Sequence, residues 1–203
     1  MVIRLEKEND YRTVENLTRD AFWNIYQPGC DEHFILHQFR NDPAFIPELD
    51  YVIEEEGELI AHIMYCHVHI QCDDGRKVPA ILFGPISVSP DHQGKGYGSA
   101  LIRFTLKRAR ELGYSAVVIE GNPAYYHRFG FQSSSCFGVY APGVSRNEEA
   151  AFSMALELDE GYFNGIQGVV VLPAPYHCDP EAVEAFDRQF PPKIKQRRPG
   201  QLR

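Results

Sequence analysis

The sequence lacks the features that mark secreted and membrane proteins. Its five cysteines are an odd number and form no CxxC pair, so no disulfide framework is indicated. It begins with no charged-then-apolar leader, and no apolar run reaches membrane-spanning length. These absences predict a reduced, cytoplasmic protein with no membrane role.

Positive charge is scarce as well. The chain has 20 Lys and Arg against 28 Asp and Glu, a formal net charge of −8, which argues against a nucleic-acid-binding protein. The last segment is the exception, because PPKIKQRRPGQLR carries five cations and no acid. This pattern predicts either a solvated, partly disordered tail or an arm that grips an anionic ligand or a partner subunit.

What the sequence does contain is an alternation of strand and helix patterns over 203 residues, a length that suits one domain. Helical spacing of apolar residues begins at Val14 and Leu17 and returns along SALIRFTLKRAREL, with further helices expected within 31–42 and 122–131. Strand patterns cover 51–56, 58–71, 80–90, 114–121, 150–158 and 168–173. The break at Gly84-Pro85 indicates a bulge or splay. This order predicts an α/β or α+β domain with one central sheet.

Three glycines at alternate positions, Gly94, Gly96 and Gly98, lie between a strand and the start of a helix. Unpaired backbone N–H groups and the helix dipole at such a start attract anions, and glycines let a phosphate approach them. The pattern therefore predicts a phosphate cradle. The alternative is a tight turn that packs closely against its neighbours.

Two common phosphate-binding motifs do not fit this loop. A Walker A loop ending at Gly94-Lys95 needs glycine where Ser89 stands, and Gly96 follows the lysine in place of Ser or Thr. A dinucleotide fingerprint needs a third glycine where Ser99 or Leu101 stands. Both nucleotide interpretations are therefore weak.

A third pattern fits without adjustment. Gln93, Gly96 and Gly98 spell Q-x-x-G-x-G after the strand end ISVSP, and EGNPAYYHRFGF follows the next strand. Over 83–131 these motifs resemble the acyl-CoA binding motif and the Tyr-containing motif of the GNAT superfamily of N-acyltransferases. The resemblance implies the GNAT fold: an α/β (α+β) domain with a central mixed, mostly antiparallel twisted sheet, a splayed strand pair and flanking helices. It would span 1–172, followed by a C-terminal extension at 173–203.

The resemblance also implies acetyl-CoA as cosubstrate and a set of residues that bind it. Main-chain N–H groups of the glycine loop would hold the pyrophosphate, with added charge from the lysine, and the strand before the loop would hold the pantetheine arm. A polar residue at the end of the following strand would lie near that arm. By position these residues are Gln93, Gly94, Lys95, Gly96, Tyr97, Gly98 and Ser99 for the loop, Ile86, Ser87 and Val88 for the strand, and Asn122 for the polar residue.

Two residues are candidates for proton transfer. Tyr126 lies where the family often carries a tyrosine near the CoA sulfur, and a phenol of pKa ~10 suits a general acid that protonates the leaving thiolate. The alternative for Tyr126 is a packed aromatic with a bonded hydroxyl. Glu120, at the end of an apolar strand, is the best-placed candidate base, although water could serve and a carboxylate there is usually solvated.

The resulting prediction is an acetyl-CoA-dependent N-acetyltransferase that acts on a primary amine of a small molecule or peptide in a ternary complex. The alternative is a non-catalytic acyl-CoA sensor. A homodimer is expected by resemblance only. No metal is expected, because HFILH has Phe34 where a zincin needs glutamate, and CHVH sets His67 and His69 on the strand face opposite Cys66.

Overall fold

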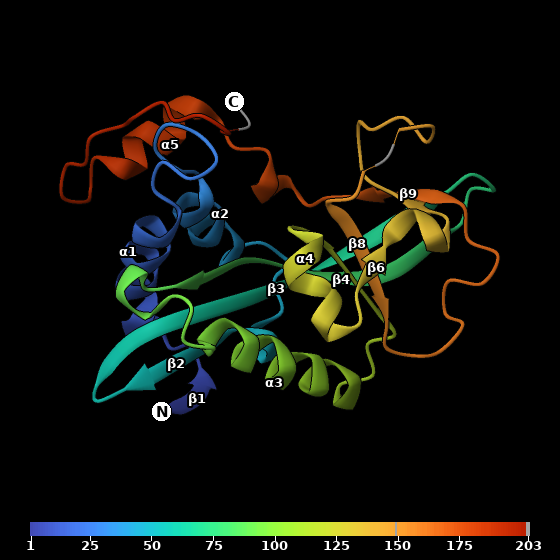
Figure 1. Ribbon diagram of the computed structural model, residues 1–203, viewed down its shortest axis with the longest axis horizontal. Helices are drawn as coiled ribbons and strands as arrows, with labels where there is room; N and C mark the ends of the chain where they lie inside the picture. Colours follow the sequence, from blue (N-terminus) through green and yellow to red (C-terminus); the bar gives the residue numbers. More distant parts are fainter. Residues whose placement is uncertain (149, 202–203) are drawn as a thin grey trace. The chain divides into compact units, whose positions relative to one another are not determined.

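The computed structural model describes residues 1–148 and 150–201 (Figure 1). Within these residues the strands form one mixed nine-stranded sheet, in the order β1-β2-β3-β4-β5-β8-β6, and β9 pairs with β3 and β7. The strands are β1 Val2–Leu5, β2 Tyr51–Glu55, β3 Glu58–Cys72, β4 Lys77–Val88, β5 Ala116–Glu120, β6 Gln132–Ser133, β7 Val139–Tyr140, β8 Ser153–Glu157 and β9 Gly168–Val171. The predicted central mixed sheet is confirmed.

Helices connect these strands in the order that the sequence predicts. They are α1 Tyr11–Phe22, α2 Glu32–Phe39, α3 Tyr97–Glu111, α4 Pro123–Tyr126 and α5 Pro180–Asp187, with 3-10 turns that include η3 Pro90–His92 and η4 His127–Phe129. The short strands β6 and β7 and the helix α5 were not predicted. The first two are only two residues long, too short to show an alternating pattern.

Pairing in the sheet is mostly antiparallel, as expected. The antiparallel pairs are β1 with β2, β2 with β3, β3 with β9, and β8 with both β5 and β6. Strand β4 runs parallel to β5, with Ile81 opposite Val117 and Leu82 opposite Val118. β4 then continues through Gly84 to Val88, so the predicted irregularity does not interrupt the strand itself.

The chain divides into two compact units, which are described separately. Unit 1 comprises Met1–Met64, Pro85–Ile102 and Ala174–Arg203, and unit 2 comprises Tyr65–Gly84 and Arg103–Pro173. Strands β3 and β4 and helix α3 contribute residues to both units. The division of the chain into a domain at 1–172 and an extension at 173–203 stays a prediction.

In unit 1, helix α1 packs against α2, and α2 packs against α5 (Figure 1). Val14 and Leu17 of α1 and Leu36 and Phe39 of α2 are buried, and burying a side chain of this size stabilises a fold by about 1.5–3 kcal/mol. Arg19 of α1 is fully buried as well and donates to both carboxylate oxygens of Asp187, at 2.6 and 3.2 Å. This pairing ties α1 to the end of α5.

The basic tail lies along α1 and the loop that follows it. The indole N–H of Trp23 and the side-chain amide of Asn24 both donate to the carbonyl of Ile194, each at 3.0 Å. The amide oxygen of Asn24 accepts from the backbone N–H of Gln196, also at 3.0 Å. Lys193 and Lys195 form ion pairs with Asp20 and Glu184, and Arg203 lies outside the described residues.

In unit 2, the core includes residues on both faces of β5 and β8, because consecutive residues of these strands are buried, together with aromatic side chains. Val117 and Val118 of β5 and Met154 and Ala155 of β8 are buried. Phe131, between η4 and β6, is 1% exposed. A bidentate ion pair between Arg146 and Asp73 joins two surface loops, with both N–O distances at 2.6 Å.

Helix α3 differs from the prediction at both ends. It begins at Tyr97, two residues before the expected start, so Gly98 lies in its first turn. The predicted apolar stripe is buried at Leu101, Ile102, Leu106 and Ala109. Leu112 is exposed because the helix ends at Glu111 and Gly113 turns the chain with a φ of +84°. Among the described residues, no helix is long and apolar enough to cross a membrane.

Candidate functional site

The glycine loop in unit 1 connects η3 to α3. Gly94 and Gly96 have φ values of +75° and +94°, a backbone conformation that residues with a Cβ rarely adopt. A Cβ built on either glycine meets no heavy atom within 4 Å. The protein therefore leaves open space in front of this loop, and close packing against neighbours, the alternative raised by the sequence, does not explain these two glycines.

The backbone of the loop presents a run of unpaired donors. Among the described residues, the N–H groups of Gly94, Lys95, Gly96, Tyr97 and Gly98 donate to no acceptor, and the helical ladder begins with Ala100 N–H donating to Gly96 at 3.0 Å. Successive unpaired N–H groups at a helix start, together with the helix dipole, form an anion-binding concavity. The loop thus has the chemistry that the sequence predicts for a phosphate site.

Side chains fix the strand end against this loop. The amide nitrogen of Gln93 donates to the carbonyl of Val88 at 3.2 Å. The hydroxyl of Ser87 is buried and lies 3.0 Å from the hydroxyl of Thr18 on α1, whereas Ile86 is half-buried. Gln93 therefore holds the turn in place, and the hydroxyl of Ser87 faces the protein interior, where Thr18 contacts it.

An acidic cleft borders the loop, and the sequence did not predict it. Glu55, Lys95 and Tyr97 line a space of about 370 Å³ together with Glu56, Glu58, Ile60 and His92. The Tyr97 hydroxyl donates to the Glu55 carboxylate, and this bond holds the pKa of Glu55 below its usual range. Glu55 lies 42 positions before Tyr97, so only the fold brings the acidic residues to the glycine loop.

In unit 2, the Tyr-containing motif forms a short, well-capped helix. Asn122 is the N-cap of α4: its side-chain oxygen accepts from the N–H of Ala124 at 3.0 Å, and Pro123 occupies the first turn. After η4, Gly130 ends the segment with a φ of +94°. The helix predicted within 122–131 is confirmed, and the cap gives Asn122 a structural role besides the predicted one.

Tyr126 lies at the end of α4 in an aromatic cage. Its ring centroid is 5.9 Å from that of Phe83, 6.0 Å from Phe131 and 6.4 Å from Phe129. The neighbouring Tyr125 meets it edge-to-face at 5.1 Å. Such contacts stabilise one ring orientation, so the cage sets the direction of the Tyr126 hydroxyl.

Glu120 ends β5, where its backbone pairs with Ser153 of β8. Its side chain is exposed, yet the surrounding protein atoms partly desolvate the carboxylate and raise its pKa. A raised pKa makes a carboxylate a stronger base. Glu120 therefore has the direction of shift that a proton acceptor needs.

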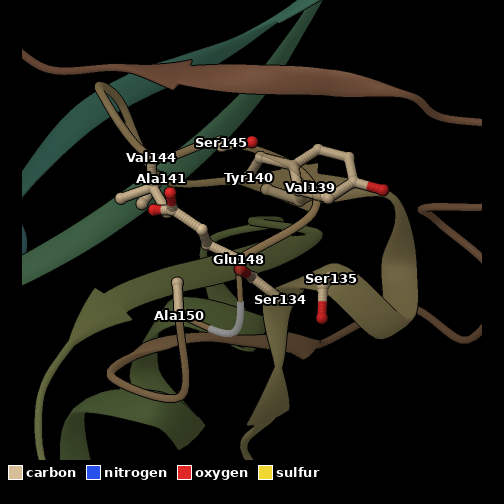
Figure 2. A pocket seen from close by; sticks show the side chains of 9 residues that line it. All are labelled: Ser134, Ser135, Val139, Tyr140, Ala141, Val144, Ser145, Glu148 and Ala150. Atoms are coloured by element: carbon tan, nitrogen blue, oxygen red, sulfur yellow. The ribbon is translucent and has the colours of Figure 1, made fainter.

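A small pocket in unit 2 is too small for either substrate. It holds about 10 Å³ and is lined by Ser134, Ser135, Val139, Tyr140, Ala141, Val144, Ser145, Glu148 and Ala150. In Figure 2 the side chain of Glu148 reaches toward Ala141 and Val144 and fills part of the space. This volume is at the lower limit for one water molecule.

Unit 1 also contains a buried polar cluster that the sequence did not predict. Glu6, Asp50 and His62 place ligand-type atoms within 4.8 Å of one another. However, Arg40 donates to both Glu6 oxygens, at 2.6 and 3.2 Å, and His62 Nε2 lies 2.7 Å from Asp50. Because the guanidinium already supplies the positive charge, we interpret the cluster as an ion-pair network. Its members are far apart in sequence, so no local motif could reveal them.

The predicted site residues therefore fall into two groups. Unit 1 holds the strand and loop residues 86–88 and 93–99, and unit 2 holds Glu120, Asn122 and Tyr126. Within unit 1 the structure brings the strand end, the loop and the acidic cleft together. His33, in the HFILH segment, is fully buried, and its ring lies beside the carboxylate of Asp187.

Comparison with known proteins supports the resemblance found in the sequence. A family model described as an acetyltransferase (GNAT) domain matches residues 2–133. The uncharacterized N-acetyltransferase YhbS of Escherichia coli strain K12 is 29% identical over 172 residues, which cover 84% of this chain and 95% of the relative.

Two solved structures have the same fold and contain the expected ligand type. YhbS from Escherichia coli in complex with CoA matches with a TM-score of 0.74 and 25% identity, over 87% of this chain and 92% of that one. A GNAT family acetyltransferase from Brucella melitensis in complex with acetyl-CoA matches with a TM-score of 0.68 and 28% identity, over 86% and 97%. The predicted GNAT fold is confirmed, and the chain belongs to the GNAT family of acetyltransferases.

Proposed function

We propose that this protein is an N-acetyltransferase that transfers the acetyl group of acetyl-CoA to a primary amine of a small molecule or peptide. The observation that carries the proposal is the run of unpaired N–H groups from Gly94 to Gly98, in which Gly94 and Gly96 face open space. The complexes of two similar proteins with CoA and acetyl-CoA support the choice of cosubstrate.

Cosubstrate binding is assigned to the glycine loop, to the strand end before it and to Asn122. The N–H groups of 94–99 hold the pyrophosphate, and Lys95, which is exposed, adds positive charge near it. The backbone of Ile86, Ser87 and Val88 and the side chain of Asn122 hold the pantetheine arm. Gln93 acts on the loop through its bond to the Val88 carbonyl.

The reaction is a direct displacement in a ternary complex. The amine nitrogen attacks the thioester carbonyl, so a C–N bond forms while the C–S bond breaks. Tyr126 donates its phenolic proton to the departing thiolate, and the proton of the attacking amine passes to Glu120 or to water. The raised pKa of Glu120 supports its role as the acceptor.

The wider assignments follow from the same family. The catalytic domain spans 1–172, the segment 173–203 is an extension of it, and the protein forms a homodimer. The five cysteines carry free thiols, which supports a cytoplasmic location.

A thiol-release assay tests the proposal. Purified protein is mixed with acetyl-CoA and a panel of primary amines, including polyamines, amino acids, aminoglycosides and peptides, and free CoA is followed with a thiol reagent. At least one class of amine should release CoA above the amine-free rate. Binding of acetyl-CoA without release for any amine would identify a non-catalytic sensor, and failure to bind acetyl-CoA would refute both functions.

A further inference from the structure

We propose that Gly121 is a positioning residue for Tyr126: the missing side chain at position 121 creates the space that the tyrosine ring occupies. The catalytic consequence of this inference rests on the proposed function. The steric relation itself rests only on the geometry of unit 2, where both residues lie.

The distances leave no room for a side chain. A Cβ built on Gly121 would lie 2.3 Å from Cε2, 2.9 Å from Cδ2 and 3.3 Å from Cζ of Tyr126. Gly121 does not have a positive φ, so its backbone conformation does not require glycine. The ring edge of Tyr126 is therefore the reason that this position must lack a side chain.

The backbone on the glycine side is held by the sheet. The N–H of Gly121 donates to the carbonyl of Phe152 at 2.8 Å, directly after the paired residues Glu120 and Ser153 of β5 and β8. A shift of Gly121 away from the ring would break this bond and the adjoining pairing. The backbone at position 121 is thus fixed relative to β8.

The ring side is equally constrained. The N–H of Tyr126 donates to the carbonyl of Asn122 at 3.1 Å, which fixes its Cα in α4. Phe83 and Phe131, 4% and 1% exposed, pack against its ring. A methyl group at position 121 must therefore rotate or displace the ring, and the hydroxyl at the far end of the ring moves with it.

Such a displacement matters for proton transfer. A catalytic group works only when it lies within hydrogen-bond reach of the atom that it protonates. Because a misplacement of ~1 Å can reduce a rate by about 10²-fold, we expect Gly121→Ala to lower kcat by roughly 10- to 100-fold. The Kd for acetyl-CoA should change by less than about twofold, because the loop in unit 1 supplies the proposed phosphate contacts.

A double-mutant cycle tests the steric relation without using activity. Gly121→Ala, Tyr126→Ala and the double variant are compared by thermal unfolding. Overpacking should lower the Tm of Gly121→Ala by roughly 2–6 °C. The same glycine substitution should leave Tm unchanged in the Tyr126→Ala background, because the conflicting ring is gone. An equal loss of Tm in both backgrounds would overturn the inference.

Two further variants complete the test. Gly165→Ala is the control. Gly165 has a φ of +73°, and a Cβ built on it meets nothing within 4 Å. This substitution therefore strains the backbone at a position other than the Tyr126 contact and should leave kcat unchanged. A kcat for Gly121→Ala equal to that of Gly165→Ala would refute the positioning role. Tyr126→Phe keeps the ring and tests the acid alone. Full activity of that variant would refute the proposed acid while the Tm cycle still decides whether Gly121 accommodates the ring.

Discussion

Two sets of glycines in this molecule have opposite surroundings. Gly94 and Gly96 have positive φ values and face open space, whereas Gly121 has no positive φ and would place a Cβ 2.3 Å from an aromatic ring. The first set serves a backbone that a ligand must approach. Gly121 serves a side chain of the same protein. Glycine is required in both places, but for different physical reasons.

The two regions also have different proposed roles, one in binding acetyl-CoA and the other in turnover. The loop in unit 1 offers backbone N–H groups and is lined nearby by acidic side chains. The surroundings of Tyr126 in unit 2 are aromatic, with Phe83 and Phe131 against the ring. We therefore expect substitutions in unit 1 to change binding of acetyl-CoA and substitutions around Tyr126 to change turnover.

The largest expected effect is that of Tyr126→Phe. Removing the hydroxyl deletes the proposed acid and keeps the caged ring, so kcat should fall by about 10²-fold or more. The Kd for acetyl-CoA, measured by calorimetry, should change by less than about twofold. Tyr125→Phe is the control, because the same atom is removed from the adjacent residue. Equal losses of kcat in the two variants would contradict this division between the regions.

The next-largest effect distinguishes two reasons for glycine in the loop: the positive φ of the backbone and the open space that a missing side chain leaves. Asparagine adopts positive φ more readily than other residues with a side chain, so Gly96→Asn should keep most of the stability of the protein. Its side chain would nevertheless stand where the phosphates approach. We expect the Kd for acetyl-CoA to rise by at least about 10-fold, which corresponds to a loss of roughly 1.4 kcal/mol of binding free energy.

The control for that experiment is Gly165→Asn, at a turn with a φ of +73° and open surroundings. Calorimetry of acetyl-CoA binding and thermal unfolding are run on both variants. Unchanged binding by Gly96→Asn would mean that no ligand enters the open space in front of the loop. A loss of binding by both variants would trace the effect to general destabilisation.

A third effect concerns pH and the base. The pKa of Glu120 lies above its ordinary value of 4.5 because desolvation penalises its charged form. The carboxylate is therefore lost as pH falls through that raised pKa, and kcat/KM should fall with it. Glu120→Gln should lower the rate at neutral pH by about 10-fold and remove this part of the pH dependence.

The pH profile is measured with one amine for both proteins, so that protonation of the acceptor affects them equally. Glu148→Gln, an exposed acid elsewhere in unit 2, is the control for loss of one negative charge. Superimposable profiles for wild type and Glu120→Gln would assign the proton acceptor to water.

Local sequence patterns predicted much of the fold because several elements carry strong periodicity or stop signals. The α3 stripe at Leu101, Ile102 and Leu106 and the Gly130 stop after α4 are examples. Helix α5 was not predicted. It is eight residues long and is stabilised by long-range contacts such as the pairing of Asp187 with Arg19, which no local pattern reveals.

The candidate site shows the same limit. Local sequence indicated the glycine loop by its spacing, and it indicated Tyr126 by the resemblance of EGNPAYYHRFGF to a family motif. It could not find the acidic cleft, where Glu55 meets Tyr97 across 42 positions, or the cluster of Glu6 with His62. It also recorded Gly121 only as part of a motif, since the reason for that glycine is a ring that folding brings onto it.

The smallest expected effect tests the electrostatics of the loop. The carboxylate of Glu55 lines the same cleft as Lys95, so it opposes an anion bound at the loop. Glu55→Gln removes the charge and keeps an oxygen that can accept from the Tyr97 hydroxyl. Binding of acetyl-CoA should tighten by about twofold, and the gain should shrink as salt screens the repulsion.

Glu160→Gln provides the matched change of net charge, on an exposed residue of unit 2. Calorimetric titrations with acetyl-CoA at low and high salt compare the two variants with wild type. Equal tightening by both would assign the effect to net charge rather than to the cleft. Weaker binding by Glu55→Gln would mean that the bond to Tyr97 orders the start of α3, in which case the acidic hairpin supports the binding loop instead of opposing its ligand.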